Sequence, residues 1–466
     1  MEKKHLRRDC SVRSIMALAG PTMLEQLMNT AGQYVDTAMV GSLGTQATSA
    51  VGSTGTVNWL INSTVSAIGV GFLALISRAC GEGNLSEAKR ASAQSLLAVL
   101  VFGVFFTVLT LCLSPCIPVW MQVESDTQRL ASEYFFILYS PMLFRTATII
   151  FGTVLRAAGD TKSPRRVGIL VNVINVVLNF CLIYPTRQYV LWGGEIILPG
   201  AGLGIHGAAI ASAVSFAVGG ICMTCILWHH PIISPRGRSL VPDPEILRPC
   251  LRVALPNAIQ RFGTCFGYVV FASMINSLGD ISTAAHTIAN TVESAFYIPG
   301  YGMQTAAATL AGNALGEGDE LKLRKLGAKL LVLELVLMLG SGSLLFLLAP
   351  KMVMLFSKDQ QVILLGTTVL RMVALSEPFY GISIIVEGML QGMGRTVFSL
   401  VINLVGMWAV RIIGTYLCIG LMDMGLIAAW GCMIGHNMLL FGVYCFYYST
   451  GLWNPFRKKK KIQISA

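Results

Sequence analysis

The chain has 466 residues, of which 54% are hydrophobic and only 12% carry a charge. Because soluble domains have about 25% charged residues, this composition excludes an ordinary soluble globular protein. The formal net charge of +11 does not indicate a nucleic-acid partner, since the basic residues gather between hydrophobic runs and at the two ends of the chain.

Hydrophobic runs of about 20 residues, the length that crosses a bilayer as a helix, recur along the whole chain. Backbone groups cannot stay unpaired in lipid, and the strict alternation of barrel strands is missing, so the runs predict α-helices. We predict an all-α polytopic membrane protein, with twelve transmembrane helices in two pseudo-symmetric six-helix bundles. The predicted spans are 14–40, 47–77, 92–113, 131–155, 167–186, 205–228, 252–277, 283–313, 327–349, 362–391, 397–419 and 425–449.

The distribution of Lys and Arg predicts the orientation of these spans. Most of the basic residues fall on one side of the predicted membrane, which the positive-inside rule assigns to the cytoplasm together with both termini. The basic run at 457–461 allows two interpretations, a solvated topology anchor or a contact with anionic lipid headgroups.

The second half of the chain repeats the first at an offset of 235 residues, which takes Pro21 to Pro256 and the Gly-Glu-Gly at 81–83 to that at 316–318. Each half has the same number of spans, so the repeat is parallel, an arrangement found in transporters. The predicted domains are an N-terminal six-helix lobe at 1–228, a proline-rich cytoplasmic linker at 229–250, and a C-terminal six-helix lobe with a basic cytoplasmic tail at 251–466.

Prolines fall at matching places of the two halves, Pro21 and Pro256 in the first span of each and Pro141 and Pro378 in the fourth. Proline removes a backbone hydrogen bond and bends a helix. The pattern fits either a bending motion or a static curvature of these helices.

One acid breaks the repeat, because Asp36 in the first span corresponds to Phe271 in the second half. An unpaired carboxylate at mid-membrane costs about 2.5 to 3.5 kcal/mol, so its presence favours a function over a merely solvated helix end. Glu25 lies three helical turns earlier on nearly the same face. With Asn29 and Gly32, these residues form a polar stripe that is typical of a cavity lining.

The fifth span carries Asn172, Asn175 and Asn179 on one helical face. Amides in this arrangement can bind an ion, orient a carboxylate or hold two helices together. Ser212, in the sixth span, lies in a run of small residues that permits close helix packing.

The second half contains acids of its own. Glu293 lies near the middle of the eighth span without an obvious partner nearby in the sequence, so we expect it to contact substrate. Opposite charges at this depth usually pair, which predicts a structural network of Glu377 or Glu387 with Arg411. The residues that we expect to bind substrate are Glu25, Gln33, Asn58, Asn62 and Glu293.

Nothing in the sequence indicates an enzyme. The phosphate-binding loop Gly-x-x-x-x-Gly-Lys-Ser/Thr is missing, and no serine or cysteine nucleophile has a plausible base nearby. We therefore expect no cofactor, and an ion gradient is the natural energy source for any transport.

Several motifs together resemble one family. They are the segment at 35–44 (Val-Asp-Thr-Ala-Met-Val-Gly-Ser-Leu-Gly), the loop pair at 81–84 and 316–319, the segment at 155–164 and the Gly-Ala-Ala at 207–209. In combination these motifs resemble the multidrug and toxic compound extrusion (MATE) family of antiporters, in particular its bacterial DinF-like branch, over nearly the whole chain.

The resemblance implies a V-shaped cavity between two bundles in a bacterial inner membrane. The cation-coupling residues of the family fall on Asp36, Asn175, Asn179 and Ser212, and a sodium ion could bind at the first three. Asn179 stands where such members usually have aspartate, and Ser212 stands where threonine is usual, so one titratable group is lost. Second-lobe coupling is not expected, because Thr264 and Tyr380 occupy the places of the acids it uses.

The predicted function is therefore secondary active efflux of cationic lipophilic drugs or toxins by alternating access, in exchange for H+ or Na+. The expected partners are these compounds and membrane lipids, with the protein acting as a monomer. The alternative is a flippase for a lipid-linked saccharide, whose anionic cargo would suit Arg145, Arg371 and Arg411. A receptor or scaffold is disfavoured, since no sizeable soluble domain is present.

Overall fold

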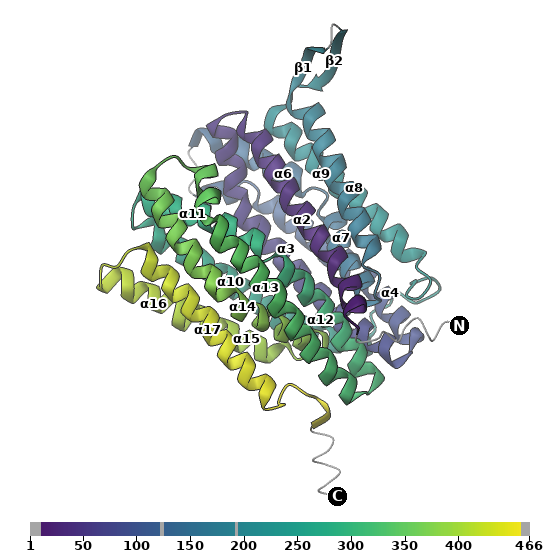
Figure 1. The fold of residues 1–466 in the computed structure, drawn as a ribbon. Helices are drawn as coiled ribbons and strands as arrows, with labels where there is room; N and C mark the ends of the chain where they lie inside the picture. The colour runs from purple at the N-terminus through teal and green to yellow at the C-terminus, as the bar shows by residue number, and fades with distance from the viewer. Residues whose placement is uncertain (1–10, 122–124, 192–193, 458–466) are drawn as a thin grey trace, which may run out of the picture. The chain divides into compact units, whose positions relative to one another are not determined.

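The computed structural model describes residues 11–121, 125–191 and 194–457 (Figure 1). Each of the twelve predicted spans is a helix or a succession of helices, which confirms the predicted fold class. The helices of the first half are α2 (Val12–Gly41), α3 (Thr45–Glu82), α4 (Leu85–Leu113), α5 (Ile117–Trp120), α6 (Ser125–Tyr139), α7 (Met142–Ala157), α8 (Lys162–Ile183) and α9 (Gly204–Trp228).

The second half contains one irregular span. Its helices are α10 (Pro244–Asn276), α11 (Asp280–Phe296), α12 (Ile298–Glu317), α13 (Glu320–Phe356), α14 (Gln360–Gly392), α15 (Thr396–Val405), α16 (Ile413–Tyr416) and α17 (Leu426–Ser449). The wider π-helical segments η1 (Gly406–Ile412) and η2 (Leu417–Leu421) flank α16, so this span changes its helical pitch along its length. Such wider turns are rare and recur at functional sites.

A β-hairpin joins α8 to α9 and is the feature that the all-α prediction missed. Strands β1 (Pro185–Leu191) and β2 (Gly194–Ala201) pair antiparallel, with an irregular register near Pro185 (Figure 1). A connection this short between two hydrophobic spans leaves little hydropathy signal, so the sequence indicated only a loop.

Nine helices of the described chain are long and hydrophobic enough to cross a membrane, and α6 with α7 makes a tenth across a 51° bend. The bend falls at Pro141, which has no N–H to donate, whereas α14 continues through Pro378. Two predicted spans remain, and both are helical. Helix α2 is less hydrophobic than the others, and the other span is divided into α11 and α12. In α2 the cause is the polar stripe that the sequence shows.

The chain forms two compact units. One consists of Leu24–Phe72 and Leu85–Arg248, and the other of Met1–Met23, Leu73–Asn84 and Pro249–Ala466. Helices α2 and α3 each contribute to both units, so the predicted division at 229–250 remains a prediction. Of the predicted basic tail at 457–461, all but its first residue lies outside the described residues.

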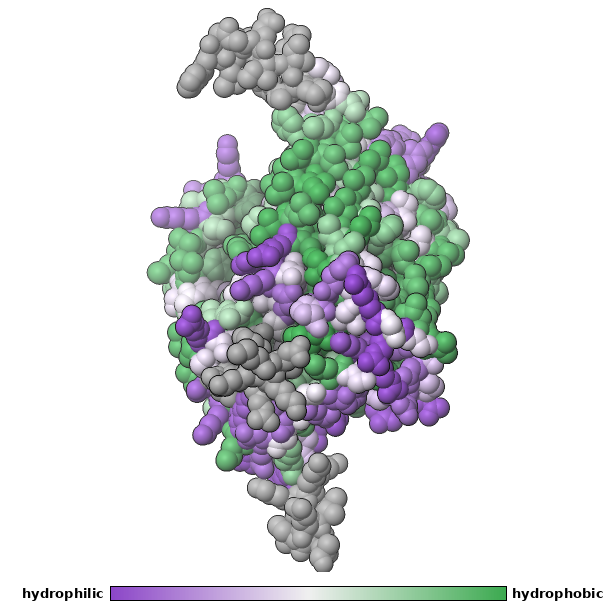
Figure 2. Space-filling view, turned by 90° about the vertical axis from the view of Figure 1, so that its right-hand side faces the viewer, coloured by the Kyte–Doolittle hydropathy of each residue, from purple (hydrophilic) through white to green (hydrophobic). Residues whose placement is uncertain are grey.

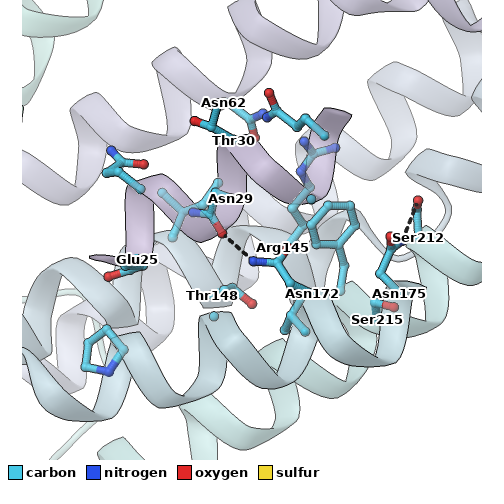
Figure 3. Close-up of a pocket in the computed structure, with 18 of the residues that line it drawn as sticks. Glu25, Asn29, Thr30, Asn62, Arg145, Thr148, Asn172, Asn175, Ser212 and Ser215 are labelled. Carbon is cyan, nitrogen blue, oxygen red and sulfur yellow. Dashed lines mark hydrogen bonds between the residues drawn. The ribbon is translucent and has the colours of Figure 1, made fainter. Parts of the chain in front are cut away.

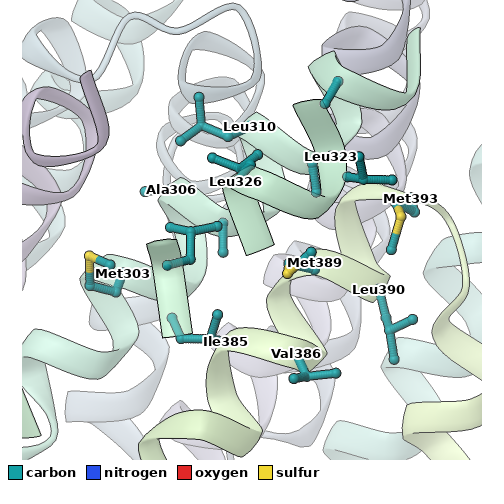
Figure 4. Packing of buried hydrophobic residues seen from close by; sticks show 14 of the residues in the cluster. Met303, Ala306, Leu310, Leu323, Leu326, Ile385, Val386, Met389, Leu390 and Met393 are labelled. Atoms are coloured by element: carbon teal, nitrogen blue, oxygen red, sulfur yellow. The ribbon is translucent and has the colours of Figure 1, made fainter. Parts of the chain in front are cut away.

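The core of the second unit is built where α12, α13 and α14 pack together. Figure 4 shows Met303 and Leu310 of α12, Leu326 of α13, and Ile385 and Met389 of α14 in one buried cluster. Glycine makes the close approach of α12 and α14 possible, because a Cβ at residue 392 would collide with the backbone of residue 308. The cluster fixes the helices of this unit against each other.

Hydrophobic side chains also cover much of the outer surface. On α4, the exposed residues Leu100, Val101, Val104, Phe105 and Val108 recur at spacings of one, three and four and so share one face. Figure 2 shows hydrophobic residues over a broad area of one side of the molecule. A surface of this kind suits contact with lipid, in agreement with the hydropathy of the spans.

Candidate functional site

A cavity of about 420 Å³ lies within the unit that contains α7, α8 and α9. Its walls come from these three helices and from the parts of α2 and α3 that belong to the same unit (Figure 3). Cavities of a few hundred Å³ with a small number of polar groups are the usual sites for drug-sized ligands. The polar residues of the wall therefore define a candidate binding site.

The polar stripe on α2 faces this cavity, as the sequence predicts. Glu25, Asn29, Gly32 and Asp36 all line it. Asn172 of α8 donates a hydrogen bond from Nδ2 to Oδ1 of Asn29 across 3.0 Å (Figure 3). Glycine at position 32 leaves room for this contact, because a Cβ there would lie 2.8 Å from Oδ1 of Asn172.

The structure brings together the four residues that the resemblance assigned to cation coupling. Asn179 Nδ2 donates to Oδ1 of Asp36 across 2.6 Å and lies 3.1 Å from Oδ1 of Asn175. Asn175 lies in turn 3.0 Å from Oγ of Ser212 (Figure 3). Both asparagines are buried, with 8% and 1% of their surface exposed, so α2, α8 and α9 meet in a largely enclosed polar cluster.

The hydrogen-bond partners of Asn175 assign the orientation of its amide. With its nitrogen toward Asp36, the amide lies 2.6 Å and 3.2 Å from the two oxygens of the carboxylate, and its own oxygen accepts from Ser212 Oγ across 3.0 Å. Asn175 can therefore donate to Asp36 and accept from Ser212 at the same time.

Glu25 is the second acid in the wall, and its charge is paired. Nη1 of Arg156 lies 3.0 Å from Oε2 of Glu25, and each side chain is only 16% exposed. Sequence reasoning placed Arg156 in a cytoplasmic loop and missed this ion pair, because the two residues are far apart in the chain and on different helices.

The predicted cavity residues in α2 and α3 have different positions. Gln33 and Asn62 line the cavity, whereas Asn58 is not among the residues that line it. Oδ1 of Asn58 instead accepts from Nη2 of Arg145 across 2.5 Å and from Oη of Tyr139 across 2.8 Å. Asn58 thus holds a basic residue that does line the cavity.

Glu293 belongs to the other unit, where it is 5% exposed and accepts a hydrogen bond from Oη of Tyr297 across 2.9 Å. Glu334 and Glu377 are buried in the same unit, and within the described residues their carboxyl oxygens have no hydrogen-bond partner. Several uncharged carboxyl groups are the simplest way to bury so many acids together.

The predicted network of Arg411 with Glu377 or Glu387 is wrong for the part of the chain that the structure describes. Glu387 accepts from Gln260 across 2.9 Å instead. The guanidinium carbon of Arg411 lies 4.2 Å from the ring centroid of Phe271, the counterpart of Asp36 in the repeat. Stacking on an aromatic ring replaces the expected ion pair.

Comparison with known proteins agrees with this architecture. The profile of the MatE family matches residues 21–181 and again 256–417, and the two matches begin 235 residues apart, the offset of the internal repeat. The "Probable multidrug resistance protein NorM" of Thermotoga maritima is 26% identical over 95% of this chain and 93% of its own length.

Two further proteins extend the comparison. "Multidrug and toxin extrusion protein 1" of Mus musculus is 25% identical over 91% of this chain and 72% of its own length. A solved structure described as the outward-facing conformation of a multidrug resistance MATE family transporter of the MOP superfamily aligns with a TM-score of 0.88, covering 98% of both chains at 23% identity. Because the profile matches more than half of the chain in two repeats, this chain belongs to the MatE family, the multidrug and toxic compound extrusion family of membrane transporters.

Proposed function

We propose that this chain is a secondary active transporter that exports cationic lipophilic compounds by alternating access in exchange for H+ or Na+. Family membership and the names of the relatives support this function. The observation that carries the proposal is the position of Asp36, held by Asn179 in the wall of a drug-sized cavity.

Asp36 is the coupling residue because its charge is available. Of the two carboxylates that line the cavity, Glu25 is neutralised by Arg156, whereas Asp36 forms no ion pair with any described basic residue. An ionised Asp36 attracts a cation, and a protonated one does not. A proton, a sodium ion and a cationic drug can therefore compete for the same carboxylate.

The oxygen atoms around Asp36 suit either coupling ion. Asn179 Oδ1 is buried and has no hydrogen-bond partner among the described residues, which leaves an acceptor beside the carboxylate. Asn175 and Ser212 add further oxygen atoms, and hard cations such as Na+ prefer oxygen ligands. We propose these four residues as the cation-coupling site.

In the proposed cycle, Asp36 takes up its ion from the outside and releases the drug. It returns the ion to the cytoplasm when the cavity opens inward, and the cavity then accepts drug again. Each ion that crosses the full field contributes about 2.3 kcal/mol per 100 mV. A ligand shifts the two conformations only by its differential affinity for them, so competition at one carboxylate couples the two fluxes.

Other cavity residues are proposed to bind substrate. Gln33 and Asn62 can hydrogen bond to a ligand from α2 and α3, and Glu25 is proposed to do so while paired with Arg156. Glu293 stays a proposed substrate contact of the second unit, since it is a buried acid without an ion pair in the described chain.

The expected setting follows from the surface and the charge distribution. We place the protein in a bacterial inner membrane, with both termini cytoplasmic, as a lipid-contacting monomer of the DinF-like branch. Exposed hydrophobic helix faces and the clustering of Lys and Arg on one side of the predicted membrane support this placement. No catalytic activity, cofactor or nucleic-acid partner is part of the proposal.

The flippase alternative is less well supported. Of the three arginines that favoured an anionic lipid-linked cargo, only Arg145 lines the cavity, and two carboxylates line it as well. Arg371 contacts the ring of Phe346, with its guanidinium carbon 5.2 Å from the centroid. With Glu25 paired to Arg156, the wall has one free carboxylate and one guanidinium, which is no excess of positive charge for a pyrophosphate.

The direct test is dye export from proteoliposomes, with the pH gradient and the sodium gradient imposed separately. We expect one of the two gradients to drive export of a cationic dye. Absence of export under both gradients, in vesicles that bind the dye, would refute the proposed function.

A further inference from the structure

Arg145 is a buried cation in the cavity wall. It lies on α7, is 6% exposed and lines the cavity beside Thr148, one helical turn further along (Figure 3). Its guanidinium carbon is 4.5 Å from the ring centroid of Phe216, another lining residue, and 5.5 Å from that of Tyr139. No carboxylate among the described residues forms an ion pair with it.

The hydrogen bonds of Arg145 leave it incompletely satisfied. Its acceptor, Oδ1 of Asn58, also accepts from Tyr139 and, across 3.4 Å, from Asn62, so one neutral oxygen serves three donors. Nη1 is buried and has no partner in the part of the chain that the structure describes. A buried guanidinium is stable only when its N–H groups and its charge are compensated, so Arg145 can accommodate an anionic partner from the cavity.

The charges of the cavity indicate what that partner is. With Glu25 neutralised by Arg156, the uncompensated charges in the wall are Asp36 and Arg145, which form no ion pair with each other. A purely cationic ligand would compensate Asp36 but would leave Arg145 without an anionic partner. A ligand that carries a cationic amine and a carboxylate would compensate both charges at once.

We propose that Arg145 is the anion-binding residue of this cavity, and that it recognises the carboxylate of zwitterionic substrates. The inference rests on the proposed function and assigns it a specificity-determining residue. The planar guanidinium has a fork of donors that matches a carboxylate, and the ring of Phe216 offers a face for a flat aromatic ligand. Asp36 then receives the cationic end of the molecule.

The test uses the purified full-length protein and two dyes that differ only in one charge, a rhodamine with a free benzoate group and the methyl ester of the same dye. Fluorescence polarisation gives the Kd of each dye for the wild type, Arg145→Gln, Arg145→Lys and Arg129→Gln. The last variant is a matched control, because Arg129 is an exposed arginine of the same unit, paired with Glu133.

We expect the wild type and Arg129→Gln to bind the free benzoate dye more tightly than its ester. Arg145→Gln should weaken binding of the benzoate dye about tenfold or more and leave binding of the ester unchanged or tighter. Arg145→Lys should fall in between, since it keeps the charge but loses the fork.

Three results would overturn the inference. Equal or tighter binding of the ester by the wild type would show that the carboxylate is not recognised. Equal loss of both dyes in Arg145→Gln would give the residue a purely structural role. Binding of amine-free benzoate as tightly as the dye would replace the zwitterion with a purely anionic ligand.

A transport measurement separates this inference from the proposed function. If the wild type binds the benzoate dye through Arg145 but exports neither dye under an ion gradient, the anion site stands and the proposed function fails. If it exports the ester but shows no dependence of benzoate binding on Arg145, the function stands and the anion site fails.

Discussion

Asn179 donates a hydrogen bond to Asp36, with 2.6 Å between Nδ2 and Oδ1, and so joins α8 to the polar stripe of α2. A hydrogen bond to a carboxylate is shorter and stronger than one between neutral groups. The amide therefore holds the carboxylate in position without adding a second charge. One ionisable group, rather than two, remains in this cluster.

Asn179→Asp should make transport depend more strongly on sodium. The substitution places two carboxylates against each other, and a bound cation relieves their repulsion. We expect the sodium gradient to stimulate dye export by this variant several-fold more than by the wild type, measured in proteoliposomes at fixed pH.

Asn172→Asp is the matched control, because Asn172 lies on the same face of α8 but bonds to Asn29. Export by the control should respond to sodium as the wild type does. The same sodium response in both aspartate variants would show that Asn179 has no special place beside Asp36.

The losses of stability on removing Glu25 and on removing Arg156 should not be additive, because the two side chains form an ion pair. Both side chains are 16% exposed, so removing one partner should cost more than the about 1 kcal/mol of an exposed pair and less than the about 3 to 5 kcal/mol of a fully buried one, because the other charge stays uncompensated. Glu25→Gln and Arg156→Gln should each lower the melting temperature in detergent, and the double variant should lower it less than the sum. Additive losses would mean that the two charges do not interact.

The crossing of α12 and α14 should not tolerate a methyl group at position 392. Gly392→Ala forces a Cβ into the backbone of Ala308, and overpacking of this kind costs about 1 to 3 kcal/mol. Gly340→Ala, in α13 of the same unit, is the control, since its Cβ would meet nothing within 4 Å. Thermal unfolding should show a clear loss for the first variant and none for the second.

The loop after α9 should loosen as the pH falls. Nδ1 of His230 accepts from the backbone N–H groups of Ile232 and Ile233, at 3.2 Å and 3.3 Å, which only the unprotonated nitrogen can do. Burial lowers the pKa of His230 below its ordinary value of 6.5, and Asp160, whose Oδ2 lies 3.9 Å from Nε2, opposes this only in part.

Because the folded state favours neutral His230, the protection of these two amides is complete above pH 6.5 and is lost as the pH falls through the lowered pKa. Hydrogen exchange, corrected for the intrinsic rate at each pH, measures the effect. In His230→Asn the side-chain oxygen accepts at every pH, so the dependence should disappear. Persistence of the dependence would place its origin elsewhere.

Hydropathy and the internal repeat predicted most of the fold, because the length and composition of a membrane helix are fixed by the bilayer. The helical face shared by Asn172, Asn175 and Asn179 was also readable, since spacings of three and four define one side of a helix. The structure places this face against Asp36 and Ser212. Residue spacing does not indicate that α2, α8 and α9 meet there. Only the family resemblance predicted this contact.

The sequence could not predict the contacts that Arg145 and Arg156 make at the cavity wall. Arg156 follows a hydrophobic span and was counted among the cytoplasmic charges, yet it reaches Glu25. Arg145 was named only in support of the flippase alternative. Its partners Asn58 and Phe216 come from other helices, and one sequence does not show which helices are neighbours. Tertiary packing decides these contacts.

The central claim is that the charge of Asp36 couples ion entry to drug export, and Asp36→Asn tests it most directly. The variant keeps the shape of the side chain and its neighbour Asn179, so it should fold and melt as the wild type does. Gradient-driven export of a cationic dye from proteoliposomes should fall at least tenfold, to the level of vesicles without protein. Export at the wild-type rate by this folded variant would contradict the account.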